Sequence, residues 1–226
     1  SKGYEADGLL YLKSGSKEQN ILAKQGDDLR IDWGYFYMVA GKENTAYSVG
    51  NSTELRKNFV NGTLNSASLE GEDSNGNMAL VRSHGKVKNV TDKIMLGYDD
   101  IYSIQYFGTN LRPYWNSKGD RTIEAEMLAA YNEYDKLLAR CYAFDKKLME
   151  DASAAGGKEY AELCALAYRQ SIAAHKLVEA PNGDLLWLSK ENNSNGCINT
   201  VDLTYPSAPL LSLIHISEPT RQAEIS

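Results

Sequence analysis

Two long helical patterns follow one another in the second half of the chain, and they restrict its fold more than any other feature. The first covers Thr122–Glu150 and the second runs from about Lys158 to Glu179, with apolar residues at helical spacing in both. Ala-Ala-Gly-Gly at 154–157 separates them, and a Pro-Asn-Gly turn at 181–183 ends the second. Two long helices with so short a link form an antiparallel hairpin. One hairpin cannot enclose a hydrophobic core, so these helices need further packing partners.

Polar residues mark where the helices begin. Either Asp120 or Thr122 can cap the first long helix, because a short side-chain oxygen satisfies a free N–H in the first turn. A shorter helix is predicted over Thr53–Phe59, with Ser52 or Thr53 as its cap.

The pattern of residues 1–110 predicts mainly β-strands. Short apolar runs are separated by clusters of Gly, Asn, Asp and Ser. The clearest run alternates with period two, and its second half is apolar on both faces, as in a β-sandwich or a domain interface. The predicted strands are Leu9–Lys13, Ile21–Lys24, Leu29–Ala40 and Ala79–Val87. A helix through Ile31–Ala40 would contradict this part of the prediction.

A further strand is predicted over Gly97–Phe107, and it contains two adjacent acids. In a regular strand, Asp99 and Asp100 point to opposite faces, so they can act together only if the strand bulges. Pro113 and Gly119 then mark the change from strands to helices. We therefore expect a β-sandwich-like part at 1–110 followed by a helical part at 111–210, which is an α+β arrangement.

Composition excludes several classes of protein. The 226 residues are 42% hydrophobic and 24% charged, as in ordinary soluble domains, and the net charge of −6 without a basic stripe argues against a nucleic-acid partner. The three cysteines show no CxxC spacing, so no metal site or disulfide framework is indicated. Cys141 and Cys164 fall at apolar helix positions and are predicted to be buried thiols. No cofactor-binding motif or membrane span is visible, and the residues do not indicate an oligomeric state.

The segment Leu188–Leu210 is the densest in chemical groups. It follows an apolar strand-like run and contains amides, hydroxyls, acids and a lysine, broken by Gly196, Pro206 and Pro209. Such polar loops on a rigid scaffold often carry binding and catalytic groups. The alternative is a solvated surface loop.

Three long motifs resemble the glutaminase A family. They are SKENNSNGCINTVDLTYPSAPL at 189–210, GYDDIYSIQYF with LRPYW at 97–115, and YRQSIAAHKLV at 168–178, and IDWGYFYMVA at 31–40 resembles the end of that family's β-domain. The resemblance implies the start of a six-hairpin α/α toroid after the β-domain. It also implies a secreted, periplasmic or cell-envelope hydrolase that releases ammonia from glutamine, a small-molecule substrate, without a cofactor.

The same motifs indicate the site residues. By analogy with toroid enzymes that use paired carboxylates, the candidate catalytic acids are Asp202, Glu191, Asp99 and Asp100. The candidate substrate-binding residues are Lys190, Asn192, Asn195, Asn199, Tyr205, Trp187, Arg169 and His175. We expect the segment Lys190–Tyr205 to lie beside Gly97–Tyr106, which would bring Glu191 or Asp202 near one of the other two acids.

Structural roles compete with these assignments. Asp202 can instead cap a helix whose first turn contains Pro206. His175 can pack against the following strand with its ring nitrogens satisfied locally, and Arg169 can bind a loop carbonyl or a structural acid.

Two other functions remain open, and one segment is set aside. A glycoside hydrolase or a non-catalytic binding module fits the same residues. The tail Leu211–Ser226 resembles a translated sequencing adapter, so we treat it as non-native. By itself the chain is expected to be poorly stable and inactive, because a single hairpin leaves an apolar side without partners.

Overall fold

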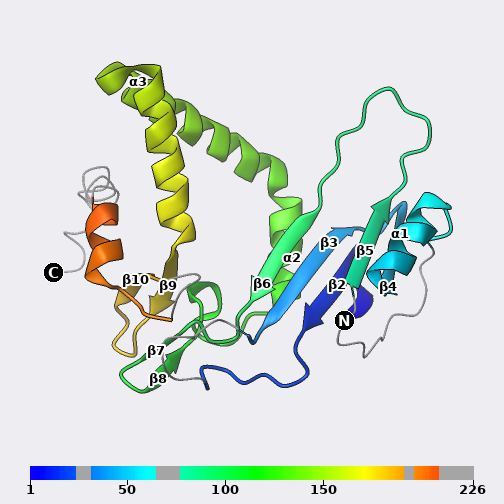
Figure 1. Ribbon diagram of the computed structural model, residues 1–226, viewed down its shortest axis with the longest axis horizontal. Coiled ribbons are helices and arrows are strands. Elements are labelled where there is room, and N and C mark those ends of the chain that lie inside the picture. The colour runs from blue at the N-terminus through cyan, green and yellow to red at the C-terminus, as the bar shows by residue number, and fades with distance from the viewer. Residues whose placement is uncertain (24–31, 65–76, 191–195, 209–226) are drawn as a thin grey trace. The chain divides into compact units, whose positions relative to one another are not determined.

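The computed structural model describes residues 1–23, 32–64, 77–190 and 196–208. It contains both sheets and helices, so the chain is an α+β protein (Figure 1). The chain divides into two compact units. The first is formed within residues 1–21, 31–101 and 118–134, and the second within 22–30, 102–117 and 135–226.

A four-stranded antiparallel sheet is the centre of the first unit. Its strand order is β1 (Lys2–Ala6), β2 (Leu9–Gly15), β3 (Tyr35–Gly41) and β6 (Met95–Asp99). The β1–β2 turn has positive φ at both Asp7 (50°) and Gly8 (78°), as the twist of a two-residue hairpin requires. The strands predicted over 9–13 and within 31–40 are therefore confirmed for the described residues.

The main core of this unit lies between the sheet and helix α2 (Ile123–Asn132). Its buried members are Leu9, Tyr11, Tyr37, Val39 and Met127. Alternate strand residues face this helix because side chains in a strand point to opposite faces in turn.

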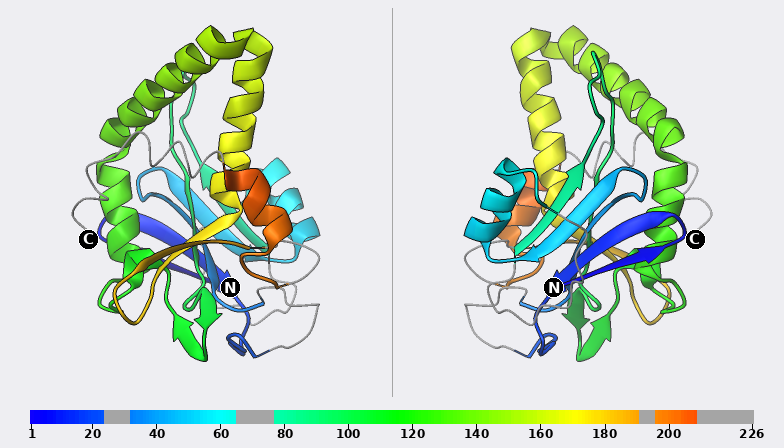
Figure 2. Two further views of the ribbon diagram at one scale, coloured as in Figure 1. Left: turned by 90° about the vertical axis from the view of Figure 1, so that its left-hand side faces the viewer. Right: turned by 90° about the vertical axis from the view of Figure 1, so that its right-hand side faces the viewer.

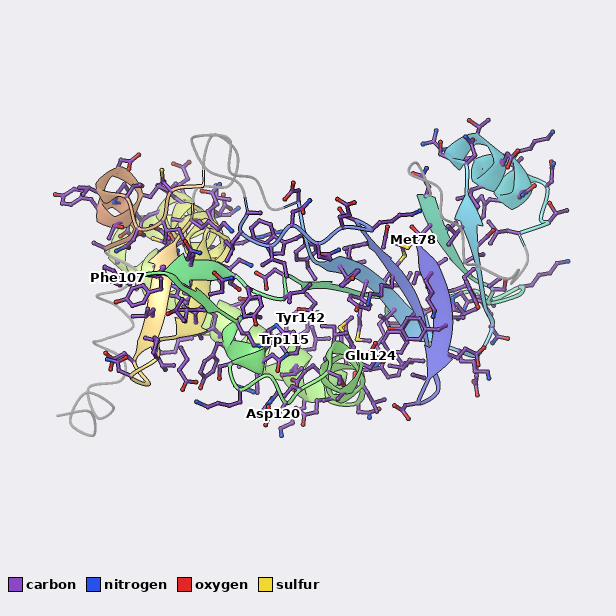
Figure 3. All side chains as sticks on the ribbon, turned by 90° about the horizontal axis from the view of Figure 1, so that it is seen from below. Met78, Phe107, Trp115, Asp120, Glu124 and Tyr142 are labelled. Carbon is purple, nitrogen blue, oxygen red and sulfur yellow. The ribbon has the colours of Figure 1, made fainter. Side chains whose placement is uncertain are left out.

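The start of α2 is fixed by two contacts. Thr122, one of the two predicted caps, accepts the N–H of Ala125 at 3.3 Å. Glu124 lies under the sheet (Figure 3) and accepts a hydrogen bond from the Tyr4 hydroxyl at 2.5 Å. Burial and this hydrogen bond raise the pKa of Tyr4 well above its ordinary range. Tyr4 therefore remains a neutral donor to Glu124 throughout the physiological pH range.

A second hairpin pairs β4 (Thr45–Gly50) with β5 (Asn77–Arg82), and helix α1 (Ser52–Val60) follows β4. The predicted cap of this helix is wrong. Asn51 takes that place, because its backbone is extended and its side-chain oxygen accepts the N–H of Thr53 at 2.9 Å. The strand predicted to reach Val87 ends at Arg82, whose Nε binds Asp92 at 2.5 Å.

The single strand predicted over Gly97–Phe107 is also wrong. β6 ends at Asp99, and the chain continues into β7 (Ile104–Tyr106), which pairs with β8 (Thr109–Leu111). The break occurs because Ile101 has φ +59°, which is incompatible with an extended strand. The argument that Asp99 and Asp100 point to opposite faces therefore does not apply.

The long helices of the second unit form the predicted hairpin, with different limits. A break at Glu133 separates α2 from α3 (Tyr134–Ala173), and α3 turns at Gly157, where φ is 83° (Figure 2). The two arms of α3 touch through Phe144 and Tyr168, whose ring centroids are 5.1 Å apart.

The second arm ends before the predicted Glu179. Residues 175–179 form β9 (His175–Glu179), which pairs with β10 (Leu185–Ser189). The Pro-Asn-Gly sequence that was expected to end the helix instead connects these two strands, with Gly183 at φ +91°. A short 3₁₀ turn (Tyr114–Asn116) lies against β9, and the described residues 201–208 are helical.

The helical arms leave much of their apolar surface exposed. Tyr142 and Leu163 are 64% and 62% exposed. Cys141 is exposed and Cys164 half-buried, so the prediction of two buried thiols is wrong, because this face of the hairpin is not covered by the described residues. Within the same residues, no helix has the length and apolar character needed to cross a membrane, and no cluster of His, Cys, Asp or Glu could hold a metal ion.

The Tyr4–Glu124 contact can be tested by removing one hydroxyl. Tyr4→Phe should lower the free energy of unfolding by about 1 kcal/mol or more, because Glu124 loses a partly buried donor. Tyr47→Phe is the control, since no hydrogen bond of that hydroxyl is found among the described residues. Denaturant unfolding that gives equal stability for both variants would contradict the proposed role of this contact.

Candidate active-site residues

Two of the predicted acids lie in a turn at the end of the central sheet. The Oδ1 atom of Asp99 accepts the N–H of Ile101 at 2.9 Å. Ile101 is left-handed, a conformation that a β-branched residue adopts only at an energetic cost. Asp99 is half-buried and Asp100 is 2% exposed. Backbone strain of this kind is often found at functional sites, and the catalytic role of the two acids in this turn stays a prediction.

Trp33 and Gly34, which directly precede β3, contact this turn. The Nε1–H of Trp33 donates to the carbonyl of Asp100 at 2.8 Å, and the indole is 6% exposed. Gly34 has φ +86°, and a Cβ atom there would lie 2.4 Å from the Asp99 carbonyl oxygen and 2.9 Å from the Asp100 Cα. Only glycine permits this approach, so the position of Asp100 depends on residue 34.

In the second unit, the segment Leu188–Leu210, which was predicted to be a polar loop, has buried residues near its start. Ser189 and Lys190 are 1% and 9% exposed. The Lys190 N–H donates to the Ala174 carbonyl at 2.8 Å, and Lys190 forms an isolated bridge with Ile198. This end of the segment is therefore anchored, and the interpretation as a solvated loop is wrong for it.

Asn199 fastens the far side of the loop to β10. Its φ is +56°, and its N–H donates to the Ser189 carbonyl at 2.8 Å. Its side-chain oxygen accepts the Thr204 hydroxyl at 3.1 Å, and the hydroxyls of Thr204 and Ser189 lie 3.4 Å apart. These contacts show a structural role for Asn199, whose substrate-binding role stays a prediction.

Asp202 lies in the first turn of the helix at 201–208, but it is not the cap. Thr200 takes that position, since its carbonyl accepts the N–H groups of Leu203 at 3.2 Å and Thr204 at 2.9 Å. Pro206 lies beyond the first turn, so this part of the capping prediction is also wrong. The Thr200 hydroxyl, followed by backbone N–H groups, lowers the pKa of the exposed Asp202 carboxyl. Asp202 is therefore ionised at neutral pH and suits a base better than a proton donor.

His175 adopts the predicted local arrangement. Its Nδ1 is hydrogen-bonded to the carbonyl of Ser171, and its ring stacks on Trp187 of the following strand at 5.2 Å between centroids. The Nε1 of Trp187 is buried and has no hydrogen-bond partner within the described part of the chain. An unsatisfied buried donor is unusual, so Trp187 remains a candidate for binding an acceptor.

Arg169 and Tyr205 lie on other elements of this unit. Arg169 lines a groove of about 680 Å³ between the arms of α3, together with Asp145 and mainly apolar side chains. Tyr205 is 81% exposed on the helix at 201–208. The surroundings of Arg169 and Tyr205 do not by themselves identify a substrate.

Three predicted site residues, Glu191, Asn192 and Asn195, lie outside the described residues. Asp202 belongs to the second unit, whereas Asp99 and Asp100 belong to the first. The expected approach of the Lys190–Tyr205 segment to the acids of the first unit therefore stays a prediction, as do the catalytic roles.

Sequence reasoning missed the residues that hold these groups in place. Ser189, Thr204 and Trp33 did not figure in the predicted site. Gly34 carried a usable signal, because an isolated glycine inside a strand pattern often marks a close backbone contact.

Comparison with known proteins gives consistent family matches. Residues 1–151 match a domain of unknown function (DUF5127), and residues 157–218 match the glutaminase A six helical-hairpin domain. A protein named Glutaminase A from Aspergillus oryzae is 27% identical over 224 residues, covering 92% of this chain and 31% of that protein. A probable glutaminase from Arthroderma benhamiae is 25% identical over 226 residues, covering 88% and 25%. No solved structure matches.

The β-rich unit and the helical hairpin, together with these matches, define a chain that joins a DUF5127 domain to part of a glutaminase A six helical-hairpin domain. The chain belongs to the glutaminase A family, and it spans a third or less of the curated relatives it matches. The two matched segments meet near Gly157, and the predicted boundaries at 110 and 210 stay predictions.

The close contact at Gly34 predicts that adding one methyl group at this position strongly lowers the free energy of unfolding. Gly34→Ala should lower the free energy of unfolding by about 3 kcal/mol, through both the positive φ and the clash with the acid turn. Gly8→Ala is the matched control, because residue 8 also has positive φ but has open space around it. It should cost only about 1 kcal/mol. Equal losses in denaturant unfolding would show that the contact with the turn contributes nothing.

The lowered pKa of Asp202 predicts a titration that depends on Thr200. Because the folded pKa lies below the ordinary value of about 3.9, ionised Asp202 stabilises the fold above that pH, and this stabilisation is lost as pH falls through the folded pKa. Thr200→Val should raise the Asp202 pKa toward its ordinary value, measured by NMR of the carboxyl carbon. Thr63→Val, at a threonine of the first unit whose hydroxyl donates to the Asn58 carbonyl, should leave it unchanged. An unaltered Asp202 pKa in Thr200→Val would refute the assigned cause.

Proposed function

We propose that the protein to which this chain belongs is a hydrolase that cleaves the side-chain amide of glutamine to give glutamate and ammonia. The observation that carries the proposal is the match of nearly the whole chain to a protein named Glutaminase A. Glutamine would be bound without a cofactor of the protein.

The chemistry can be divided between two carboxyl groups. Amide hydrolysis needs a base that activates water and an acid that protonates the leaving nitrogen. The ionised carboxylate of Asp202 suits the base. Glu191, Asp99 and Asp100 are the candidates for the acid, and hydrogen bonds hold the Asp99 side chain and the Asp100 backbone in the turn after β6.

The arrangement needed for this reaction is also part of the proposal. Residues 1–110 would form the end of a β-sandwich-like domain, and the hairpin of α3 would begin an α/α toroid. The toroid would bring Lys190–Tyr205 beside the turn that follows β6. Lys190, Asn199, Tyr205, Trp187, Arg169 and His175 would then contribute to substrate binding, with Asn192 and Asn195. We further propose that the protein acts outside the cytoplasm, in the envelope or secreted.

A glycoside hydrolase is the second candidate function. Glycoside hydrolysis also uses two carboxyl groups, and the exposed Tyr205 and the buried indole N–H of Trp187 suit contacts with a sugar. A non-catalytic module is the third, and it would need none of the acids in ionised form.

Activity of the complete gene product separates these functions. We expect ammonia release from L-glutamine and no release of nitrophenol from aryl glycosides. Asp202→Asn should reduce kcat by about a hundredfold or more, because the shape is kept and the base is lost. Asp184→Asn, at an exposed acid in the β9–β10 turn, is the control and should retain activity.

The opposite results are equally informative. Cleavage of glycosides without ammonia release would favour the second function, and inactivity on both substrates would favour the third. Near-normal turnover of a well-folded Asp202→Asn variant would remove Asp202 from catalysis and leave it only a helix-stabilising role.

A further inference from the structure

A hollow of about 460 Å³ lies in the first unit, where β2, β3, β5 and β6 come together. Its volume is in the range of small-molecule sites. None of the candidate catalytic acids lines it. The lining residues are Ser14, Gly15, Ser16, Asp32, Trp33, Gly34, Phe36, Asn77, Met78 and Tyr98.

One wall of the hollow is aromatic. Phe36 and Tyr98 are directly opposite each other on β3 and β6, so their side chains lie on the same face of the sheet. Tyr98 is 46% exposed although its ring is large and partly apolar. Its hydroxyl donates to the carbonyl of Trp33, which fixes the ring. The wall therefore offers an immobilised aromatic surface to a ligand.

The rim of the hollow is polar but contains no basic group among its lining residues. Ser14, Ser16, Asp32 and Asn77 provide hydroxyl, carboxylate and amide groups. The Ser16 hydroxyl donates to the Asp32 carbonyl at 3.1 Å, which ties the two sides of the rim together. A ligand with a carboxylate would find no basic side chain among these lining residues, whereas hydroxyl groups can donate to the oxygen acceptors of the rim.

We propose that this hollow is a binding site for a neutral carbohydrate. The apolar C–H face of a sugar ring would lie on Phe36 and Tyr98, and its hydroxyl groups would donate to Asp32 and exchange hydrogen bonds with Ser14 and Asn77. Neutral sugars combine one apolar face with an edge of hydroxyls, which is the combination that the wall and the rim present. This proposal does not rest on the proposed function.

Binding can be measured on the complete protein by NMR titration with cellobiose and with maltose, and with L-glutamine for comparison. We expect at least one disaccharide to bind in the millimolar range. Phe36→Leu should weaken it by about tenfold, because the aromatic face is lost while apolar packing of the strand is kept. Leu96→Ala is the matched control on the same face of β6, outside the hollow, and should bind as the unchanged protein does.

A second variant keeps the test independent of packing changes. Asp32→Asn, at an exposed position, should weaken disaccharide binding with the fold unchanged. The proposal is overturned if neither disaccharide binds, or if binding is unaffected by Phe36→Leu and Asp32→Asn. Binding of glutamine at these residues would also overturn it, whereas loss of glutaminase activity would leave it standing.

Discussion

The backbone contact between Gly34 and the turn after β6 is the constraint on which the end of the first unit depends. It brings the start of β3 against the Asp99 carbonyl and the Asp100 Cα, at distances that a side chain at residue 34 would prevent. The adjacent Trp33 can then reach the Asp100 carbonyl, and Tyr98 can reach the carbonyl of Trp33. One small residue thus connects two features, the rigid acid turn on one side and the aromatic hollow on the other.

In the second unit, hydrogen bonds hold the polar segment that follows β10. This segment must leave β10 and return to start the helix at 201–208, and Asn199 closes it by binding Ser189 and Thr204. Thr200 then begins the helix and holds the Asp202 carboxylate. Two of the predicted substrate-binding residues, Lys190 and Asn199, also hold the segment in place, Lys190 through its backbone. In this part of the chain, the residues that stabilise the segment are therefore neighbours of, or the same as, the predicted site residues.

Periodicity predicted the strands and the helical hairpin because it reflects which faces are buried, and the Gly-Gly link predicted the turn at Gly157. The prediction from periodicity was wrong where a local contact determines the backbone conformation. The strand expected through Asp100 breaks at Ile101, and the helix expected to reach Glu179 stops early because β9 finds a partner in β10. Thr200, and not Asp202, caps the helix at 201–208. Both residue types can cap a helix, so the sequence does not show which of the two takes the position. The candidate acids came from a family resemblance, because no spacing in a sequence states which carboxylates meet in space.

We propose that Asp202 and the acid turn after β6 act in one active site. A double-mutant cycle of Asp100→Asn and Asp202→Asn, read as kcat/KM for glutamine in the complete protein, tests it most directly. If the two groups act on one substrate bond, each single variant loses activity, and the double variant loses far less than the product of the two losses. Full activity of Asp202→Asn would contradict a shared site. So would losses that multiply both in this cycle and in the same cycle with Asp99→Asn in place of Asp100→Asn.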